Sequence, residues 1–111
     1  MERVYYFIRS EVLGTGDDEL GKLLMCNFLY TVAHRDTPPA GLIFINSGVK
    51  LPTVVEEVHE SLALLEEKGV EMLSCGTCLD YYGLKDKLVY GKVSNIHEIV
   101  DRLAGKKVVT V

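Results

Sequence analysis

The stretch Ser74-Cys75-Gly76-Thr77-Cys78-Leu79-Asp80-Tyr81-Tyr82-Gly83-Leu84 holds two of the three cysteines of the chain, three residues apart. It follows a short apolar run, Val70 to Leu73, which is typical of a buried strand. It precedes a short segment, residues 81–84, that we expect to be helical. Cysteines placed between a strand and a helix lie near the positive end of the helix dipole, where a thiolate is stabilised. The pattern therefore predicts a reactive thiol at this turn, held in place by the rest of the chain.

Length and composition favour one globular domain over residues 1–111. The 111 residues are 48% apolar and 25% charged, with no break in composition along the chain. A chain of this length can bury roughly two-thirds of the surface that it exposes when unfolded, so its core needs no metal or disulfide. We therefore expect free thiols and no cofactor.

The charge distribution argues against nucleic-acid and membrane partners. The net charge is −4, from 16 acidic and 12 basic residues, and no run of Lys or Arg exceeds two residues. No apolar run approaches the length of a membrane span, and no signal peptide precedes the first apolar run. An odd number of cysteines without a secretion signal favours a reducing compartment, so we expect a cytoplasmic protein.

Apolar runs and helix signals alternate along the chain. Short β-rich runs lie at residues 4–8, 41–45, 70–73, 88–90 and 107–111. Helix start signals lie between them, near residues 15–17, at Thr53 with Glu56, and at Asn95 with Glu98. This alternation predicts an α/β fold, a three-layer sandwich with a mostly parallel sheet of about five strands and helices on both faces. The first helix is apolar on more than one side, which indicates a second contact, with another subunit.

Three polar turns, at residues 14–17, 46–48 and 75–78, are expected to meet at the carboxyl edge of this sheet, where ligands bind in folds of this type. The side chains of Asn46, Ser47 and Asn95 suit hydrogen bonding to a sulfur anion, and they suit ordinary turn and cap chemistry equally well. The candidate site consists of the thiols Cys75 and Cys78 and the binding residues Gly14, Thr15, Gly16, Asn46, Ser47, Gly76, Thr77 and Asn95.

The Cys75-x-x-Cys78 spacing alone is compatible with several uses. Zinc needs four ligands, and the sequence has no second CxxC pair and no HxxxH pair, so we expect no metal. The two thiols could form a redox-active dithiol, a sulfur carrier, or a pair of small buried residues. A nucleotide site is not expected at Gly16-x-x-x-x-Gly21-Lys22, because Leu23 stands where a P-loop needs Ser or Thr.

The chain resembles the DsrE/DsrF-like family, and within it the C-terminal domain of sulfurtransferase-like selenium metabolism proteins. The resemblance covers nearly the whole chain. It is carried by LGTGDDELGKLLM at residues 13–25, IFINSGV at 43–49, SCGTCLDYYGL at 74–84 and VSNI at 93–96.

The resemblance implies a compact α/β sandwich that assembles as a homo-oligomer, a trimer or a hexamer. Family members accept sulfur as a persulfide on one cysteine, eight residues before a glycine, and pass it to a partner protein. Cys75, eight residues before Gly83, occupies the matching position. The related proteins also carry an N-terminal TusA-like domain with a Cys-Pro motif. This chain begins directly at the DsrE-like domain, so it is either a fragment or works with a separate TusA-like carrier.

The residues and the resemblance together predict a sulfurtransferase-like carrier of sulfur or selenium that uses Cys75. Cys78 is expected to shield the persulfide or to expel the sulfur by forming a disulfide. The implied partners are sulfur donor and acceptor proteins. Two alternatives stay open, a non-catalytic oligomeric scaffold with structural cysteines and a CxxC dithiol oxidoreductase.

Overall fold

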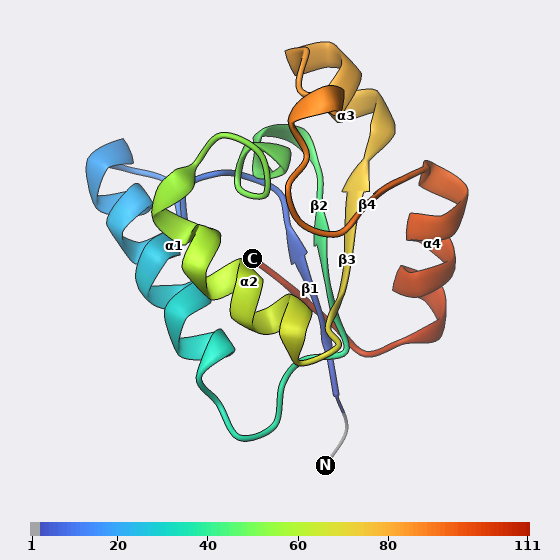
Figure 1. Ribbon diagram of the computed structural model, residues 1–111, viewed down its shortest axis with the longest axis horizontal. Helices are drawn as coiled ribbons and strands as arrows, with labels where there is room; N and C mark the ends of the chain where they lie inside the picture. The colour runs from blue at the N-terminus through green and yellow to red at the C-terminus, as the bar shows by residue number, and fades with distance from the viewer. Residues whose placement is uncertain (1–2) are drawn as a thin grey trace.

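The computed structural model describes residues 3–111, in which short strands and helices alternate (Figure 1). Met1 and Glu2, the first residues of the predicted domain, lie outside the described residues. The strands are β1 (Tyr5–Ile8), β2 (Gly41–Phe44), β3 (Glu71–Cys75), β4 (Lys92–Ser94) and β5 (Val108–Thr110). The α-helices are α1 (Asp18–Ala33), α2 (His59–Glu67), α3 (Gly76–Tyr82) and α4 (Ile96–Gly105). Short 3₁₀ helices occupy η1 (Asn46–Lys50), η2 (Glu56–Val58) and η3 (Lys85–Lys87).

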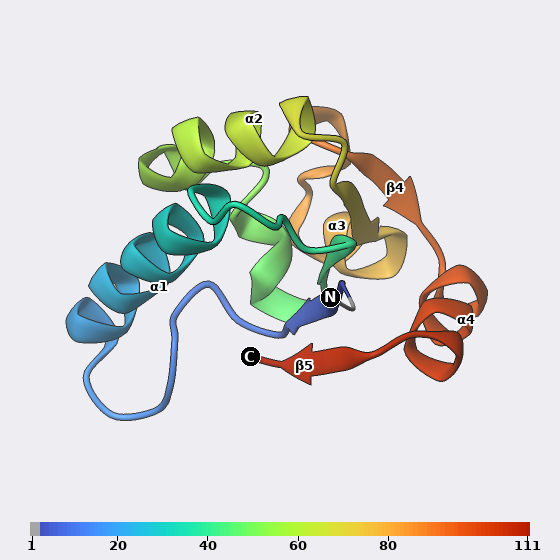
Figure 2. The same ribbon diagram turned by 90° about the horizontal axis from the view of Figure 1, so that it is seen from below.

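Within residues 3–111 the five strands form one parallel sheet in the order β4-β3-β2-β1-β5. Figure 2 shows α1 and α2 together on one face of this sheet and α4 on the other. α4 joins β4 at one edge to β5 at the opposite edge. This arrangement confirms the predicted α/β class, with a parallel sheet between two layers of helices.

Two hydrophobic cores lie on the two faces of the sheet. They follow from the alternation of side chains along a strand, which sends Leu42 and Phe44 to one face and Ile43 to the other. The larger core lies under α1 and α2 and includes Ile8, Met25, Leu29, Leu42, Phe44, Leu62, Leu65 and Met72. The smaller core lies under α4 and consists of Tyr5, Ile43, Leu73, Cys75 and Ile99.

α1 begins where the sequence predicts. Asp17 caps it by accepting the N–H of Leu20 at 2.9 Å, and His34 follows its last turn. Its second apolar side is exposed to solvent, through Leu20, Leu23, Leu24 and Tyr30. No helix among residues 3–111 combines the length and the apolarity that crossing a membrane requires.

The predicted capping box at Thr53 and Glu56 is wrong. The Thr53 hydroxyl is buried and donates to the carbonyl oxygens of Val49 (2.9 Å) and Lys50 (3.1 Å), so it closes the turn after η1 instead. α2 begins only at His59, and no side chain caps its first turn. The local motif was therefore overridden by burial of the threonine.

The chain between residues 76 and 103 also departs from prediction. Residues 88–90 form no strand; Val89 donates its N–H to the carbonyl of Pro52 at 3.0 Å, and β4 comes after Gly91. The short helix expected at residues 81–84 begins five residues earlier, at Gly76. On α4 the apolar residues are divided between core and surface, because Ile99 is buried whereas Ile96 and Val100 are exposed.

A hydrogen-bonded ion pair connects α4 to the sheet. Arg102 of α4 donates to both carboxylate oxygens of Glu71 on β3, at 2.8 and 3.0 Å. The Tyr5 hydroxyl on β1 donates to the same carboxylate at 2.6 Å. The hydrogen bonds from Arg102 lower the pKa of Glu71 to about 2, although partial burial acts in the opposite direction. A charged Glu71 thus joins two strands and a helix.

We expect Glu71→Gln to lower the free energy of unfolding by about 2 kcal/mol at pH 7, because it removes charge-assisted hydrogen bonds. A carboxyl group whose folded pKa is depressed stabilises the fold above its unfolded pKa of about 4.5 and loses this effect as the pH falls toward 2. The difference between wild type and variant should therefore shrink between pH 4.5 and pH 2 in urea titrations. Glu67→Gln, an exposed position, is the control and should change stability little at any pH. A difference that is constant with pH would contradict this role of Glu71.

Candidate functional site

Cys75 and Cys78 lie at the junction of β3 and α3. Cys75 is the last residue of β3 and pairs in register with Ser94 of β4. Its side chain is 7% exposed and belongs to the core under α4. Cys78 lies in the first turn of α3, is half-buried, and packs against both cores. Because α3 begins at Gly76, both thiols are held by regular structure rather than by a loop.

Asn46 brings the end of β2 to this junction. Its backbone N–H donates to Sγ of Cys78 at 3.1 Å. Its side-chain oxygen accepts two hydrogen bonds, from the N–H of Ser47 at 2.9 Å and from the hydroxyl of Tyr82 at 3.1 Å. The backbone of Asn46 is left-handed, with φ of 52°, a conformation that asparagine tolerates better than most residues. The residue that donates its N–H to the Cys78 sulfur therefore has a strained backbone.

η1 packs closely against the end of β1, next to the contact between Asn46 and Cys78. A Cβ atom on Gly48 would lie 2.5 Å from the carbonyl oxygen of Ile8, so only glycine fits. The Ser47 hydroxyl accepts the N–H of Glu11 at 3.2 Å and lies 3.4 Å from the Ser10 hydroxyl. The segments after β1 and β2 therefore support each other, and they fix the position of Asn46.

The surroundings of Cys78 favour its protonated form. Burial raises the pKa of the Cys78 thiol, the adjacent Cys75 sulfur raises it further, and the Asn46 N–H lowers it. A thiol that keeps its proton next to a second sulfur is able to donate that proton. The pair can thus supply one nucleophilic sulfur and one S–H group that stays protonated.

An open hollow of about 370 Å³ leads to the pair and is lined by Asn46, Cys78, Tyr81 and Tyr82. Lys50 lies at the side of this site, with its Nζ 4.7 Å from the centre of the Tyr82 ring and 3.4 Å from the carboxylate of Glu11. Cys78 rather than Cys75 therefore lines the hollow through which a reactant can approach.

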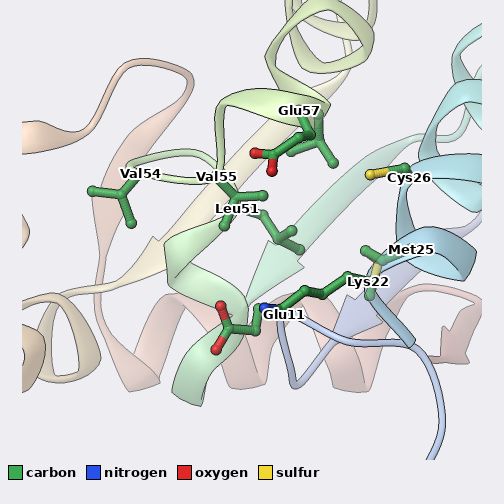
Figure 3. Close-up of a pocket in the computed structure, with 9 residues that line it drawn as sticks. Glu11, Lys22, Met25, Cys26, Leu51, Val54, Val55 and Glu57 are labelled. Atoms are coloured by element: carbon green, nitrogen blue, oxygen red, sulfur yellow. The ribbon is translucent and has the colours of Figure 1, made fainter. Parts of the chain in front are cut away.

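The third cysteine lies elsewhere. Cys26 of α1 lines a separate pocket of about 210 Å³ between α1 and the η1–η2 segment, together with Glu57 and Lys22 (Figure 3). Burial and the charge of Glu57 raise the pKa of the Cys26 thiol, which makes it a poor nucleophile at neutral pH. Within residues 3–111, no three Cys, His, Asp or Glu side chains are grouped so that they could hold a metal ion.

The structure brings only some of the predicted binding residues to the thiols. Asn46 contacts Cys78, and Ser47 binds Asn46. Gly76 is buried in the first turn of α3, where a Cβ atom would lie 3.0 Å from the carbonyl oxygen of Ser94, whereas Thr77 is exposed. Asn95 caps α4 by accepting the N–H of Glu98 at 2.9 Å, as the sequence predicts for a cap.

In the loop of Gly14, Thr15 and Gly16, the first two residues line a different hollow, with Arg9 and Val111. This loop follows β1, which lies two strands from β3 in the sheet, whereas Asn46 follows the adjacent strand β2. Two inter-strand spacings amount to roughly 10 Å, which separates this loop from the thiols.

Comparisons with known proteins support the fold and identify a family match. A model of the DsrE/DsrF-like family matches residues 23–111. None of the curated proteins searched matches the sequence. The solved structure of the YchN protein from E. coli covers 100% of both chains at 15% sequence identity, with a TM-score of 0.76.

Two further solved structures are described as proteins of unknown function. MTH1491 from Methanobacterium thermoautotrophicum covers 100% of both chains at 22% identity, with a TM-score of 0.66. BT1422 from Bacteroides thetaiotaomicron covers 96% of this chain and 94% of its own at 14% identity, with a TM-score of 0.67. At these identities the three likenesses concern the fold alone.

Sequence reasoning missed two residues of the site, Tyr82 and Lys50. Tyr82 follows Cys78 by four residues, which places both on one side of α3. That spacing is informative only once the helix is known to begin at Gly76. Lys50 carries no comparable signal, because its approach to the Tyr82 ring depends on how η1 packs against α3.

We expect Gly48→Ala to destabilise the fold by roughly 1–3 kcal/mol, because the added methyl group must displace η1 from the end of β1. The same displacement should change the reaction rate of Cys78 with iodoacetamide, since Asn46 moves with η1. Urea unfolding and peptide-resolved alkylation measure the two effects. Gly105→Ala serves as the control, because its Cβ meets nothing within 4 Å and it lies in α4. Wild-type stability in Gly48→Ala would contradict this packing.

Proposed function

Because the chain belongs to the DsrE/DsrF-like family, we propose that it carries sulfur as a persulfide on Cys75 and passes it to an acceptor protein. The observation that supports this most is the junction of β3 and α3, where two thiols adjoin and a backbone N–H is directed at one of them. The open hollow beside Cys78 offers a route for a sulfur-bearing side chain or tail of a partner.

Loading of the site is a single displacement. The thiolate of Cys75 attacks the outer sulfur of a donor persulfide, R–S–SH, and a new S–S bond forms on Cys75. The S–S bond of the donor breaks, and its electron pair leaves on the donor thiolate. The raised pKa of Cys78 keeps its proton on the sulfur during this step, and the donor thiolate takes its proton from solvent. The burial of Cys75 would then shield the persulfide from other thiols in solution.

Two routes can unload the site. In the first, an acceptor thiolate attacks the outer sulfur and restores the Cys75 thiolate. In the second, the Cys78 thiolate attacks the Cys75 sulfur, hydrosulfide leaves, and a Cys75–Cys78 disulfide forms. An external dithiol must then reduce this disulfide before the next cycle. The proposal extends to selenium, and a separate TusA-like carrier is the kind of partner that the family resemblance implies.

Two alternatives rest on specific observations. The interaction between Cys75 and Cys78 would also serve a dithiol oxidoreductase that cycles through a disulfide. The exposed apolar residues Leu20, Leu23 and Leu24 of α1 would serve a scaffold whose partner is another subunit and whose cysteines are structural. The same apolar surface supports a homo-oligomeric carrier, a trimer or a hexamer.

Intact mass after incubation with a persulfide donor tests the proposal on wild type, Cys75→Ser and Cys78→Ser. We expect wild type and Cys78→Ser to gain the mass of one sulfur atom and Cys75→Ser to gain none. Cys26→Ser is the matched control and should load like wild type, because Cys26 lies in another pocket. A parallel incubation with a selenium donor distinguishes a sulfur carrier from a selenium carrier.

Each other outcome favours one alternative. Loss of two hydrogen atoms from wild type, together with no added sulfur on Cys78→Ser, would support the oxidoreductase, because Cys78→Ser cannot discharge a persulfide by forming the disulfide. Thiols that stay unreactive until the protein is unfolded would support the scaffold.

A further inference from the structure

We propose that Tyr82 is a positioning residue, which holds the Asn46 side chain so that the Asn46 N–H stays on the sulfur of Cys78. The role of this contact in sulfur release rests on the function proposed above. The contact itself can be tested on the reduced protein alone, without any sulfur donor.

The backbone of Asn46 needs such support. A non-glycine residue with φ of 52° is in a sparsely populated conformation, which persists only where neighbouring groups hold it. The Asn46 side-chain oxygen accepts the Ser47 N–H at 2.9 Å, which is a local contact within η1. The hydrogen bond from the Tyr82 hydroxyl, at 3.1 Å, is the contact of this side-chain oxygen that comes from another element.

The geometry of α3 explains why residue 82 provides this contact. Tyr82 lies four residues after Cys78, so both side chains leave the same side of the helix toward η1. Cys78 receives the N–H of Asn46 while Tyr82 holds the side chain of the same residue. α3 therefore contacts Asn46 at two points, and the hydroxyl of Tyr82 fixes the angle at which the N–H meets the sulfur.

The groups around Cys78 come from three elements. β3 contributes Cys75, η1 contributes Asn46 and Lys50, and α3 contributes Tyr81 and Tyr82. The Lys50 ammonium group lies over the Tyr82 ring and is paired with Glu11, and Asp80 on α3 is paired with Lys85. Asn46 is thus the residue whose N–H contacts the Cys78 sulfur directly. Loss of this hydrogen bond should change the ionisation of the Cys78 thiol.

The hydrogen bond from Asn46 to Cys78 also affects the release of sulfur from Cys75. Expulsion of sulfur as hydrosulfide requires the Cys78 thiolate to attack the Cys75 sulfur. The Asn46 N–H lowers the pKa of Cys78 against the effects of burial and of Cys75. Tyr82, by holding this donor in place, would raise the fraction of Cys78 that is able to attack.

The test is the pH dependence of iodoacetamide alkylation in the full chain carrying Cys26→Ser and Cys75→Ser, which leaves Cys78 as the single thiol. We expect Tyr82→Phe to slow the reaction about three- to tenfold on the rising part of the pH profile, the range that one hydrogen bond accounts for. The plateau rate at high pH, where every thiol is ionised, should not change. Tyr30→Phe is the control, since Tyr30 is 60% exposed and lies on α1, outside the lining of the hollow beside Cys78.

A double-mutant cycle makes the proposal specific to Asn46. Glycine adopts the left-handed conformation without a side chain, so in the Asn46→Gly background the Tyr82 hydroxyl has no amide to hold. Tyr82→Phe should then have no further effect on the rate. An unchanged profile for Tyr82→Phe, an equal effect of Tyr30→Phe, or a full effect of Tyr82→Phe in the Asn46→Gly background would each overturn the proposal. If the Cys78 profile responds as expected and no persulfide forms, only the proposed function fails.

Discussion

The register between β2 and β3 determines where Asn46 lies relative to the dithiol. Phe44 on β2 pairs with Ser74 on β3, and the strands are parallel neighbours. Cys75 follows Ser74 directly, and Asn46 follows Phe44 by two residues, so the two chains leave the sheet next to each other. A slip of one residue would move the Asn46 N–H by about 3.3 Å relative to Cys78, which is enough to break their hydrogen bond.

Burial on both faces of the sheet is what prevents such a slip. Leu42 and Phe44 lie in the core under α1 and α2, and Ile43 lies in the core under α4. A one-residue shift would send each of these side chains to the wrong face. The hydrogen bonds of Glu71 with Arg102 and Tyr5 add a polar restraint at the opposite end of β3. The chemistry at one end of the strand therefore depends on apolar packing along its length.

The fold class and half of the candidate site follow from local signals in the sequence. Strand–helix alternation predicts the parallel sheet, and the ends of two buried runs place Cys75 and Asn46 at the same edge. The start of α3 could not be predicted, because Gly76 is a poor helix residue and no side chain caps the helix. Gly76 packs closely beside Ser94 and Val93, a contact between different elements that the local sequence does not reveal. The distance of the Gly14–Gly16 loop from the thiols depends on strand order, which the alternation pattern leaves undetermined.

The pairing of β5 with β1 has a consequence for how the protein is made. Tyr5 to Phe7 pair with Val108 to Thr110. One edge of β1 therefore stays unpaired until residues about a hundred positions later have been synthesised. Contacts this distant in sequence form late in folding. Until β5 arrives, the outer edge of β1 presents unpaired N–H and C=O groups that a neighbouring nascent chain could bind. The interval between translation of β1 and docking of β5 is therefore the period in which this chain is most exposed to misassembly.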